Sequence, residues 1–520
     1  MNGEGAESRT PYDRYNLAYF FLLLHGIGFL LPWNVFINAK EYFMDYKLNT
    51  TLSYNADYRV NFMSYIGFAA HFPGMCFAAW NTFYQSGTRS SKPVFRFVVA
   101  MIIEITVLLF TIAFTMIDTT DFPGVFFGLT IASVVLINCC VGIHQTLTFG
   151  MAAILPMKYS NAVIMGSNAC GTIMSIVNIL TKWLASVEGR THKTIVLAAI
   201  AYFLSAVTIV VACIVTFFWL RRLPFVLHYV ELSNKICIEV FSNSVEENGD
   251  QSALRTVDSS LRSEPLESNQ VSGRTNEDPV SYDSRTFSPC RMGSPETESL
   301  LVAHERGLMK TGMDNGLDVV RNCFALCCFR PTEGKRRCQA YWSRYASCLA
   351  ECWPHCLSVW CVFFCSLSVF PAVLSMVKPV DPNYFISPIW FTDVTCFLFF
   401  NLFAMIGCIV CNWVQFPGPR YLWIPVWFRA LVFIPFFLFC NFGFTEPRLP
   451  VLIANDHVYM LGIILFSFTN GYFASLAMMY APRSCPAEHA ELTGMLAAFF
   501  LILGVCSGVY TSRGLVSIVL

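Results

Sequence analysis

The segment 194–220 decides the fold class, and it reads TIVLAAIAYFLSAVTIVVACIVTFFWL. It holds no charged side chain, it is long enough to cross the hydrocarbon core of a bilayer, and Arg221 and Arg222 follow it directly. A transmembrane helix is the structure it favours, because the run is far longer than a barrel strand and lacks alternating apolar and polar residues.

The composition of the whole chain agrees with this one segment. Of the 520 residues, 55% are hydrophobic and 13% are charged, about half the usual charged share of a soluble domain. A soluble fold has too little interior for so many apolar side chains. Lys and Arg together number 34, as do Asp and Glu, which argues against a nucleic-acid-binding protein. We therefore expect a multi-pass protein that contacts the lipid bilayer and binds no nucleic acid.

Further apolar runs predict an all-α membrane protein with eleven transmembrane helices in a 6+5 arrangement. The runs lie at 16–36, 60–83, 94–117, 124–154, 160–183, 194–220, 353–377, 389–413, 422–443, 458–481 and 490–512. The corresponding domains are an N-terminal tail (1–15), helices one to six (16–220), a central loop (221–345), helices seven to eleven (346–512) and a C-terminal tail (513–520).

Basic residues beside the spans predict the topology. Arg221 and Arg222 abut one span and further Lys and Arg residues approach the next, so the central loop and the N-terminus are expected on the cytoplasmic side. An odd number of spans then places the C-terminal tail outside. The single Asn-x-Ser/Thr site of the chain, at Asn49, falls in the first outside loop and predicts a glycoprotein.

The stretch 242–298 of the central loop is rich in Ser, Glu, Asn, Asp and Pro, which is a composition typical of disorder. A simple spacer is one interpretation. The other is a sorting signal of the acidic dileucine type, formed by Glu296, Leu300 and Leu301, that would bind sorting adaptors. The plasma membrane is the expected location, and an endosomal or lysosomal membrane is the alternative that this motif leaves open.

Polar side chains inside a span are costly, so they mark candidate solute pathways. In the segment 160–183, Asn168, Thr172, Ser175 and Asn178 recur at steps of three or four and share one helix face. They indicate either a wet cavity or helix packing through small side chains.

Two other spans offer groups that suit a planar, hydroxyl-bearing solute. The amide of Gln145 provides donors and an acceptor for a nucleobase edge or a sugar hydroxyl, or else joins two helices. Trp33, next to Pro32, would stack on a planar ligand or anchor at the membrane interface.

Charged residues and histidines are few within the spans once the three positions at each span end are set aside. They are His25, His71, Glu104, His144, Asp393 and Arg429. They compose no recognisable catalytic or metal-ligating motif, so we expect no enzyme, no cofactor and no metal. Nearly uncharged polar spans favour a transporter of a neutral solute, and a multi-span receptor is the alternative from another class.

Short motifs follow one another in order along the membrane segments. They are Asp13-Arg14-Tyr15, Leu30-Leu31-Pro32-Trp33-Asn34, Gln145 to Gly150, Met165-Gly166 with Gly171, Phe370-Pro371-Ala372-Val373, Phe400-Asn401, Trp423-Ile424-Pro425 with Arg429, Asn470-Gly471-Tyr472 and Ala490-Glu491-Leu492-Thr493-Gly494. As an ordered set they closely resemble the equilibrative nucleoside transporter family (solute carrier family 29) in its metazoan form. Nearly all membrane segments take part, but the loop 221–345 does not.

The resemblance implies a fold similar to the major facilitator type and facilitated diffusion of nucleosides such as adenosine and uridine, with nucleobases as further candidates, by alternating access. It implies a substrate site that includes Leu30, Trp33, Gln145, Phe370 and Asn401. We add Asn168 to this site from the polar helix face. Helix packing or gating roles are expected for Gly166, Gly171, Pro371 and Asn470.

The chain departs from the family at three positions. Many members carry an Asp and an Arg where this chain has Ala404 and Cys408, which bears on how ribose is held. The monoamine branch of the family carries a Glu where this chain has Ser167, so the anionic group for an amine is missing. We therefore expect nucleosides, with organic cations or monoamines as the alternative.

Overall fold

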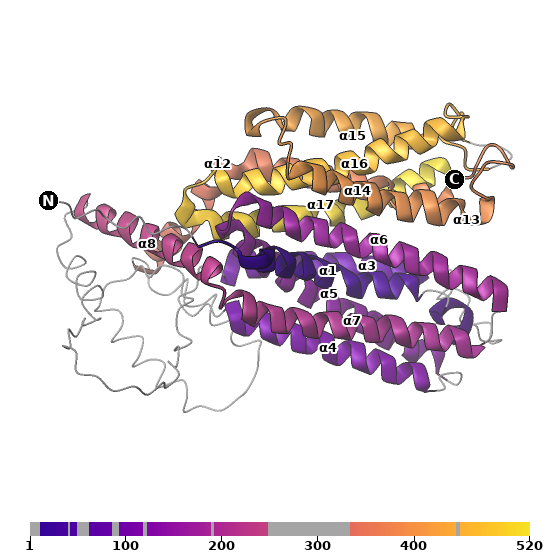
Figure 1. Cartoon of the computed structure of the whole chain (residues 1–520), viewed down its shortest axis with the longest axis horizontal. Coiled ribbons are helices and arrows are strands. Elements are labelled where there is room, and N and C mark those ends of the chain that lie inside the picture. The colour runs from indigo at the N-terminus through magenta and orange to yellow at the C-terminus, as the bar shows by residue number, and fades with distance from the viewer. Residues whose placement is uncertain are drawn as a thin grey trace. The chain divides into compact units, whose positions relative to one another are not determined.

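The computed structural model describes residues 11–39, 42–48, 62–85, 93–117, 122–188, 192–247, 333–443 and 448–520. These residues are almost entirely helical (Figure 1), and the one β-bridge among them joins Cys440 to Ile453. By its contacts the chain divides into two compact units. The helical bundle contains Met1–Ser86, Pro93–Tyr229 and Cys348–Leu520, and the second unit contains Gly87–Lys92 and Val230–Ser347.

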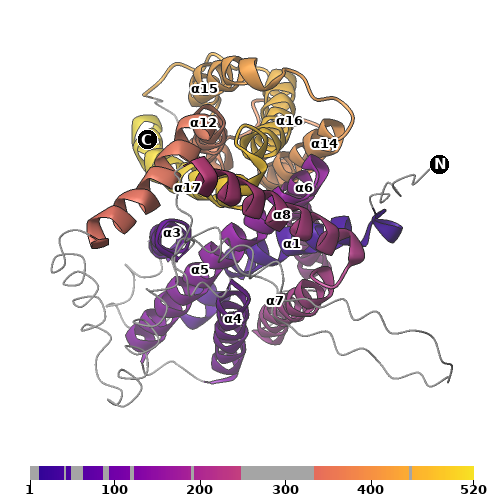
Figure 2. The same ribbon diagram turned by 90° about the vertical axis from the view of Figure 1, so that its left-hand side faces the viewer.

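The bundle has two groups of helices. The N-terminal group consists of α1 (Leu17–Asn38), α3 (Phe62–Ala79), α4 (Pro93–Met116), α5 (Pro123–Ile154), α6 (Met157–Glu188) and α7 (His192–Leu220). The C-terminal group consists of α12 (Glu333–Val369) from Cys348 onward, α13 (Pro388–Thr392), the π-helical turns η6 (Asp393–Phe399), α14 (Phe400–Cys411), α15 (Trp423–Leu438), α16 (Asp456–Tyr480) and α17 (Ala490–Val519). Figure 2 shows α4, α5 and α7 on one side and α12, α14, α15 and α16 on the other.

The structure confirms the all-α membrane class. Ten helical segments of the described residues are long and apolar enough to cross a membrane, and each coincides with one of the predicted runs. The remaining run, 60–83, forms α3 and the π-helical turn η4 (Trp80–Gln85) but is not among the ten. The count of eleven spans therefore stays a prediction.

Helix ends differ most from expectation beside the central loop and at the C-terminus. α12 ends at Val369 rather than 377, because Pro371 has no N–H to donate and disfavours helical backbone in the residue before it. α8 (Pro224–Glu247) and the beginning of α12 lie within the segment predicted as a loop, and α17 continues to Val519 through the predicted tail. Asn49 and the motif Glu296–Leu301 lie outside the described residues.

Glycines set the closest helix crossings of the bundle. A Cβ atom on Gly166 of α6 would overlap the Leu23 carbonyl oxygen of α1, and it would lie 3.1 Å from the Gly26 Cα atom. A Cβ atom on Gly471 of α16 would likewise overlap the Ala404 carbonyl oxygen of α14. Both helix pairs therefore meet through their backbones, as small residues permit in membrane proteins.

We expect Gly166→Ala to destabilise the bundle because the atom it would displace belongs to a backbone. Overpacking of this kind costs about 1–3 kcal/mol. The thermal midpoint of the detergent-solubilised chain measures the effect. Gly128→Ala in α5 is the matched control, since a Cβ atom there meets nothing within 4 Å. Equal midpoints for the two variants would contradict the close crossing.

Candidate functional site

Predicted site residues come together where α6 crosses α14, between the two groups of helices. The Asn168 amide donates to the Ile164 carbonyl at 3.2 Å and to the Cys408 sulfur at 3.3 Å. The Asn401 amide donates to the Phe397 carbonyl at 2.9 Å, and its side-chain oxygen occupies the space that a Cβ atom on Gly171 would take. The absence of a side chain on Gly171 thus lets Asn401 reach α6.

The predicted aromatic Phe370 lies next to this crossing. Its ring stacks on that of Phe400, with centroids 4.0 Å apart and planes 8° from parallel. Phe400 directly precedes Asn401, so Phe370 is placed beside the α14 end of the crossing. Pro371 follows at the break after α12, where its carbonyl accepts a hydrogen bond from the Ser375 N–H at 2.9 Å.

Leu30 and Trp33 come from α1, and both are partly buried. The Trp33 ring lies against the His71 ring of α3, with centroids 4.9 Å apart. The neighbouring Asn34 donates to the Cys170 sulfur of α6 at 3.7 Å, which holds this end of α1 against the helix that carries Asn168.

Gln145 lies on α5 and is 7% exposed. The residues on either side of it on α5 also have hydrogen-bond partners: the His144 Nε2 atom lies 3.0 Å from His25 Nδ1, and the Thr146 hydroxyl donates to the Gly142 carbonyl at 2.9 Å. The His144 Nδ1 atom has no partner among the described residues. No side-chain hydrogen bond joins Gln145 to the rest of the described chain. An amide without such a bond is a candidate for hydrogen bonding to a solute.

Asn470 belongs to a different network, within the C-terminal group. It accepts a hydrogen bond from Ser366 at 2.7 Å, and Ser366 in turn accepts one from Arg429 at 2.8 Å. The buried Arg429 also donates to Thr469 and to the carbonyls of Val362 and Phe466. These bonds occupy most of the guanidinium N–H groups, so we interpret Arg429 and Asn470 as residues that fix α12, α15 and α16 together.

An ion pair that we did not predict joins the two helix groups. Lys182, near the end of α6, lies 2.7 Å from one carboxylate oxygen of Asp393 in η6 and 2.8 Å from the other. Asn178 donates to the same carboxylate at 3.3 Å. Asp393 was identified as an intramembrane acid, but Lys182 sits one residue before the predicted end of its span and was not considered.

The opposite end of α6 also contacts the C-terminal group. The Asn161 amide donates to the Cys408 carbonyl at 2.8 Å and to the Asn412 side chain at 2.9 Å. Asn161 and Lys182 are roughly 30 Å apart along the helix. α6 therefore holds the two groups together at both of its ends and, through Asn168 and Asn401, in between.

Two groups of transmembrane helices, joined along α6 by mostly uncharged polar side chains, define a carrier-type membrane protein. The fold is similar to that of a solved major facilitator superfamily protein, the proton:xylose symporter XylE. The TM-score is 0.51 and the identity 10%, over 97% of this chain and 89% of the symporter. This likeness supports the major facilitator type of fold and, at that identity, carries no information on the solute.

The family described as nucleoside transporter matches residues 131–516. Equilibrative nucleoside transporter 2 of Rattus norvegicus is 25% identical over 513 residues, which cover 97% of each chain. Equilibrative nucleoside transporter 1 of Homo sapiens is 26% identical over 526 residues, covering 96% of this chain and 97% of the relative. The chain belongs to the nucleoside transporter family, and it is a multi-pass membrane transporter rather than an enzyme.

Proposed function

We propose that the chain carries nucleosides across a membrane down their concentration gradient, by alternating exposure of a site between its two helix groups. The observation that supports this best is that Asn168 of α6 lies against Cys408 of α14, while Asn401 of α14 lies against Gly171 of α6, at the crossing of these two helices. Amides of this kind offer donors and acceptors to ribose hydroxyls and base edges without adding charge. Leu30, Trp33, Gln145 and Phe370 complete the proposed site.

The direct test is uptake of labelled uridine and adenosine into proteoliposomes that contain the purified chain. We expect uptake that stops when inside and outside concentrations are equal, and unlabelled nucleoside should compete for it. Uptake of an organic amine in place of nucleosides would contradict the proposal, as would binding of nucleosides without any flux.

Two positions, Ser167 and Asp393, do not favour an amine substrate. Ser167, at the position where the monoamine branch has a carboxylate, donates its hydroxyl to the Ile164 carbonyl of its own helix at 2.7 Å. Asp393 is already paired with Lys182. Neither position therefore presents a free negative charge to a cation.

We expect Gln145→Ala to reduce nucleoside uptake much more than it reduces the amount of folded protein. Loss of one buried partner of a polar solute costs about 1–3 kcal/mol, which is roughly a tenfold to hundredfold loss of affinity. The measurement is the concentration dependence of uridine uptake, normalised to folded carrier.

Asn138→Ala, on the same helix, is the control for Gln145→Ala. The Asn138 amide donates to the Val134 carbonyl of its own helix at 2.8 Å, so its loss should leave uptake nearly unchanged. If the Gln145 variant matches this control, Gln145 is a packing residue and not part of the site.

We propose the plasma membrane as the location of the carrier. A glycan at Asn49 would accord with this, while adaptor binding at Glu296, Leu300 and Leu301 would move the carrier to endosomal or lysosomal membranes. Microscopy of the full-length chain with and without Leu300→Ala and Leu301→Ala decides between the two.

A further inference from the structure

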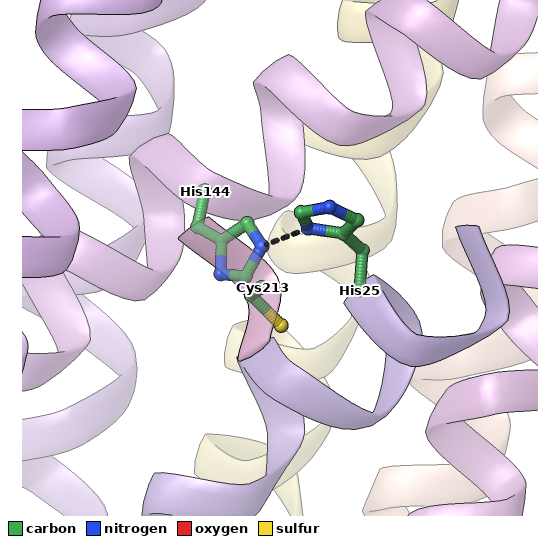
Figure 3. Close-up of side chains that lie close together, drawn as sticks. All are labelled: His25, His144 and Cys213. Atoms are coloured by element: carbon green, nitrogen blue, oxygen red, sulfur yellow. Dashed lines mark hydrogen bonds between the residues drawn. The ribbon is translucent and has the colours of Figure 1, made fainter. Parts of the chain in front are cut away.

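Side chains with metal-ligand chemistry meet inside the N-terminal helix group, apart from the proposed solute site. Figure 3 shows His25 of α1 and His144 of α5 with their rings turned toward each other and the Cys213 sulfur of α7 beside them. The His25 Nδ1 and His144 Nε2 atoms are 3.0 Å apart. One ligand atom from each of the three residues lies within 4.8 Å of the other two, and all three side chains are fully buried.

The spacing suits one ion of the zinc type. Zinc binds imidazole nitrogen at roughly 2.0–2.1 Å and thiolate sulfur at roughly 2.3 Å in tetrahedral geometry, which places two ligand nitrogens roughly 3.3 Å apart. The two facing nitrogens need to separate by only a few tenths of an ångström to reach this value. The Cys213 sulfur, which now points to the Leu24 carbonyl at 3.7 Å, is already next to them.

A buried carboxylate without a hydrogen-bond partner lies in the same helix group. Glu104 of α4 is fully buried, and neither of its oxygens has a hydrogen-bond partner among the described residues. Glu104 is not among the residues whose ligand atoms all lie within 4.8 Å of one another. An acid buried without a partner in a membrane interior is costly, so this group needs a partner that the described side chains do not supply.

Charge balance favours a divalent ion. A thiolate at Cys213 and a carboxylate at Glu104 carry two negative charges, and one divalent cation cancels them, so that the complete site is neutral in a low-dielectric interior. Two imidazoles and one thiolate favour zinc over calcium or magnesium, which prefer oxygen ligands.

The surroundings preserve the space for such a site. A Cβ atom on Gly28 would overlap the Cys213 sulfur and lie 3.4 Å from the His144 ring. The Phe97 and Phe217 rings stack on each other, with centroids 3.9 Å apart, and Phe97 also lies against both imidazoles at 5.7 and 5.2 Å. These two aromatic rings exclude water from the ligand side chains and restrict their motion.

We propose that His25, His144 and Cys213 bind one zinc ion that ties α1, α5 and α7 together, and that the buried carboxylate of Glu104 on α4 supplies the second compensating negative charge. The site is structural rather than part of the solute path. It fixes the rotation of α5 at His144, and thereby the position of Gln145, the next residue.

The test uses the full-length chain, purified with a tag that contains no histidine, stripped with a chelator and then titrated with zinc. We expect one zinc ion per chain by elemental mass spectrometry and a higher thermal midpoint when zinc is bound. Cobalt in place of zinc should give the absorption bands of a tetrahedral site and a thiolate-to-cobalt charge-transfer band. These wild-type measurements need no variant to fold.

Variants then assign the ligands. His144→Leu and Cys213→Ser should each weaken zinc binding by more than the roughly 10–100-fold that loss of an outer-shell partner costs. Cys213→Ser should also remove the charge-transfer band. The controls are His355→Leu and Cys440→Ser, which change a buried histidine and a buried thiol of the C-terminal helix group and should leave binding intact.

Two results would overturn the proposal. One is a stripped wild-type chain that takes up no zinc and shows no cobalt charge-transfer band. The other is zinc binding that survives in His144→Leu and Cys213→Ser as well as in the two controls. In either case the three residues form only a hydrogen-bonded histidine pair beside a thiol.

Discussion

Asp393→Asn is expected to loosen the contact between the two helix groups at the Lys182 end of α6. The change removes the carboxylate that holds the Lys182 ammonium at 2.7 Å and leaves that charge without its partner. The Lys182 side chain is 25% exposed and that of Asp393 8%. The cost therefore lies between those of a surface pair and a fully buried one, at about 1–3 kcal/mol.

This free energy acts on the conformational equilibrium of the carrier. The ion pair joins α6 to η6 and stabilises the arrangement in which these two elements are in contact. A loss of 1–3 kcal/mol shifts such an equilibrium by roughly 5–150-fold. We expect faster amide hydrogen exchange at the C-terminal end of α6 and in η6, together with a lower thermal midpoint.

A double-mutant cycle separates the pair from its surroundings. The cycle compares Lys182→Met, Asp393→Asn and the variant that carries both changes. The double variant removes both charges, so it should regain most of the stability that either single change loses. Lys158→Met, at an exposed lysine of the same helix, is the control and should have little effect. If the losses of stability in the two single variants simply add in the double variant, Lys182 and Asp393 do not stabilise the contact between α6 and η6 as a pair.

The sequence predicted the helices well because one physical rule dominates within a membrane. Every backbone polar group must be paired inside its own segment, so a long apolar run such as 194–220 becomes a helix, here α7 (His192–Leu220). The rule weakens where the chain leaves the bilayer. α12 begins at Glu333, well before the apolar run at 353, because its first residues need no apolar side chains to be helical.

The crossing of α6 and α14 was predictable only in part. The spacing of Asn168, Thr172 and Ser175 put these side chains on one face of a helix, and the resemblance identified Asn401. That Asn401 reaches into the space left by Gly171 follows from tertiary packing, which the local pattern does not contain.

The local sequence pattern could not predict contacts between residues that are far apart in the chain. His25 and His144 are 119 positions apart, and as isolated polar residues on apolar helices they gave no motif. Lys182 and Asp393 are 211 positions apart, and their pairing depends on how one helix group rests on the other. The one indication in the sequence was Asp393, because a charge inside a membrane segment requires a partner.

Cys408→Arg is expected to abolish uptake, because it places a charge at the centre of the bundle without a partner. Cys408 is fully buried, its sulfur accepts a hydrogen bond from Asn168, and it lies 3.6 Å from the Gly471 carbonyl oxygen at the α14–α16 crossing. An uncompensated charge in such a place costs about 3–5 kcal/mol. Cys408→Met is the neutral control that measures the effect of bulk alone.

Ala404→Asp, one helical turn before position 408, should recover part of the uptake that Cys408→Arg loses. Ala404 is also fully buried, so an aspartate there adds bulk at a cost of about 1–3 kcal/mol. The compensation of a buried charge is worth more than this, at about 3–5 kcal/mol, so Ala404→Asp with Cys408→Arg should transport better than Cys408→Arg alone. The measurement is uridine uptake per folded carrier in the unchanged chain, Cys408→Arg, Cys408→Met and the double variant. If Cys408→Arg alone and Ala404→Asp with Cys408→Arg lose the same amount of uptake, positions 404 and 408 do not act as a pair. The neutral groups at the α6–α14 crossing would then work independently of these positions.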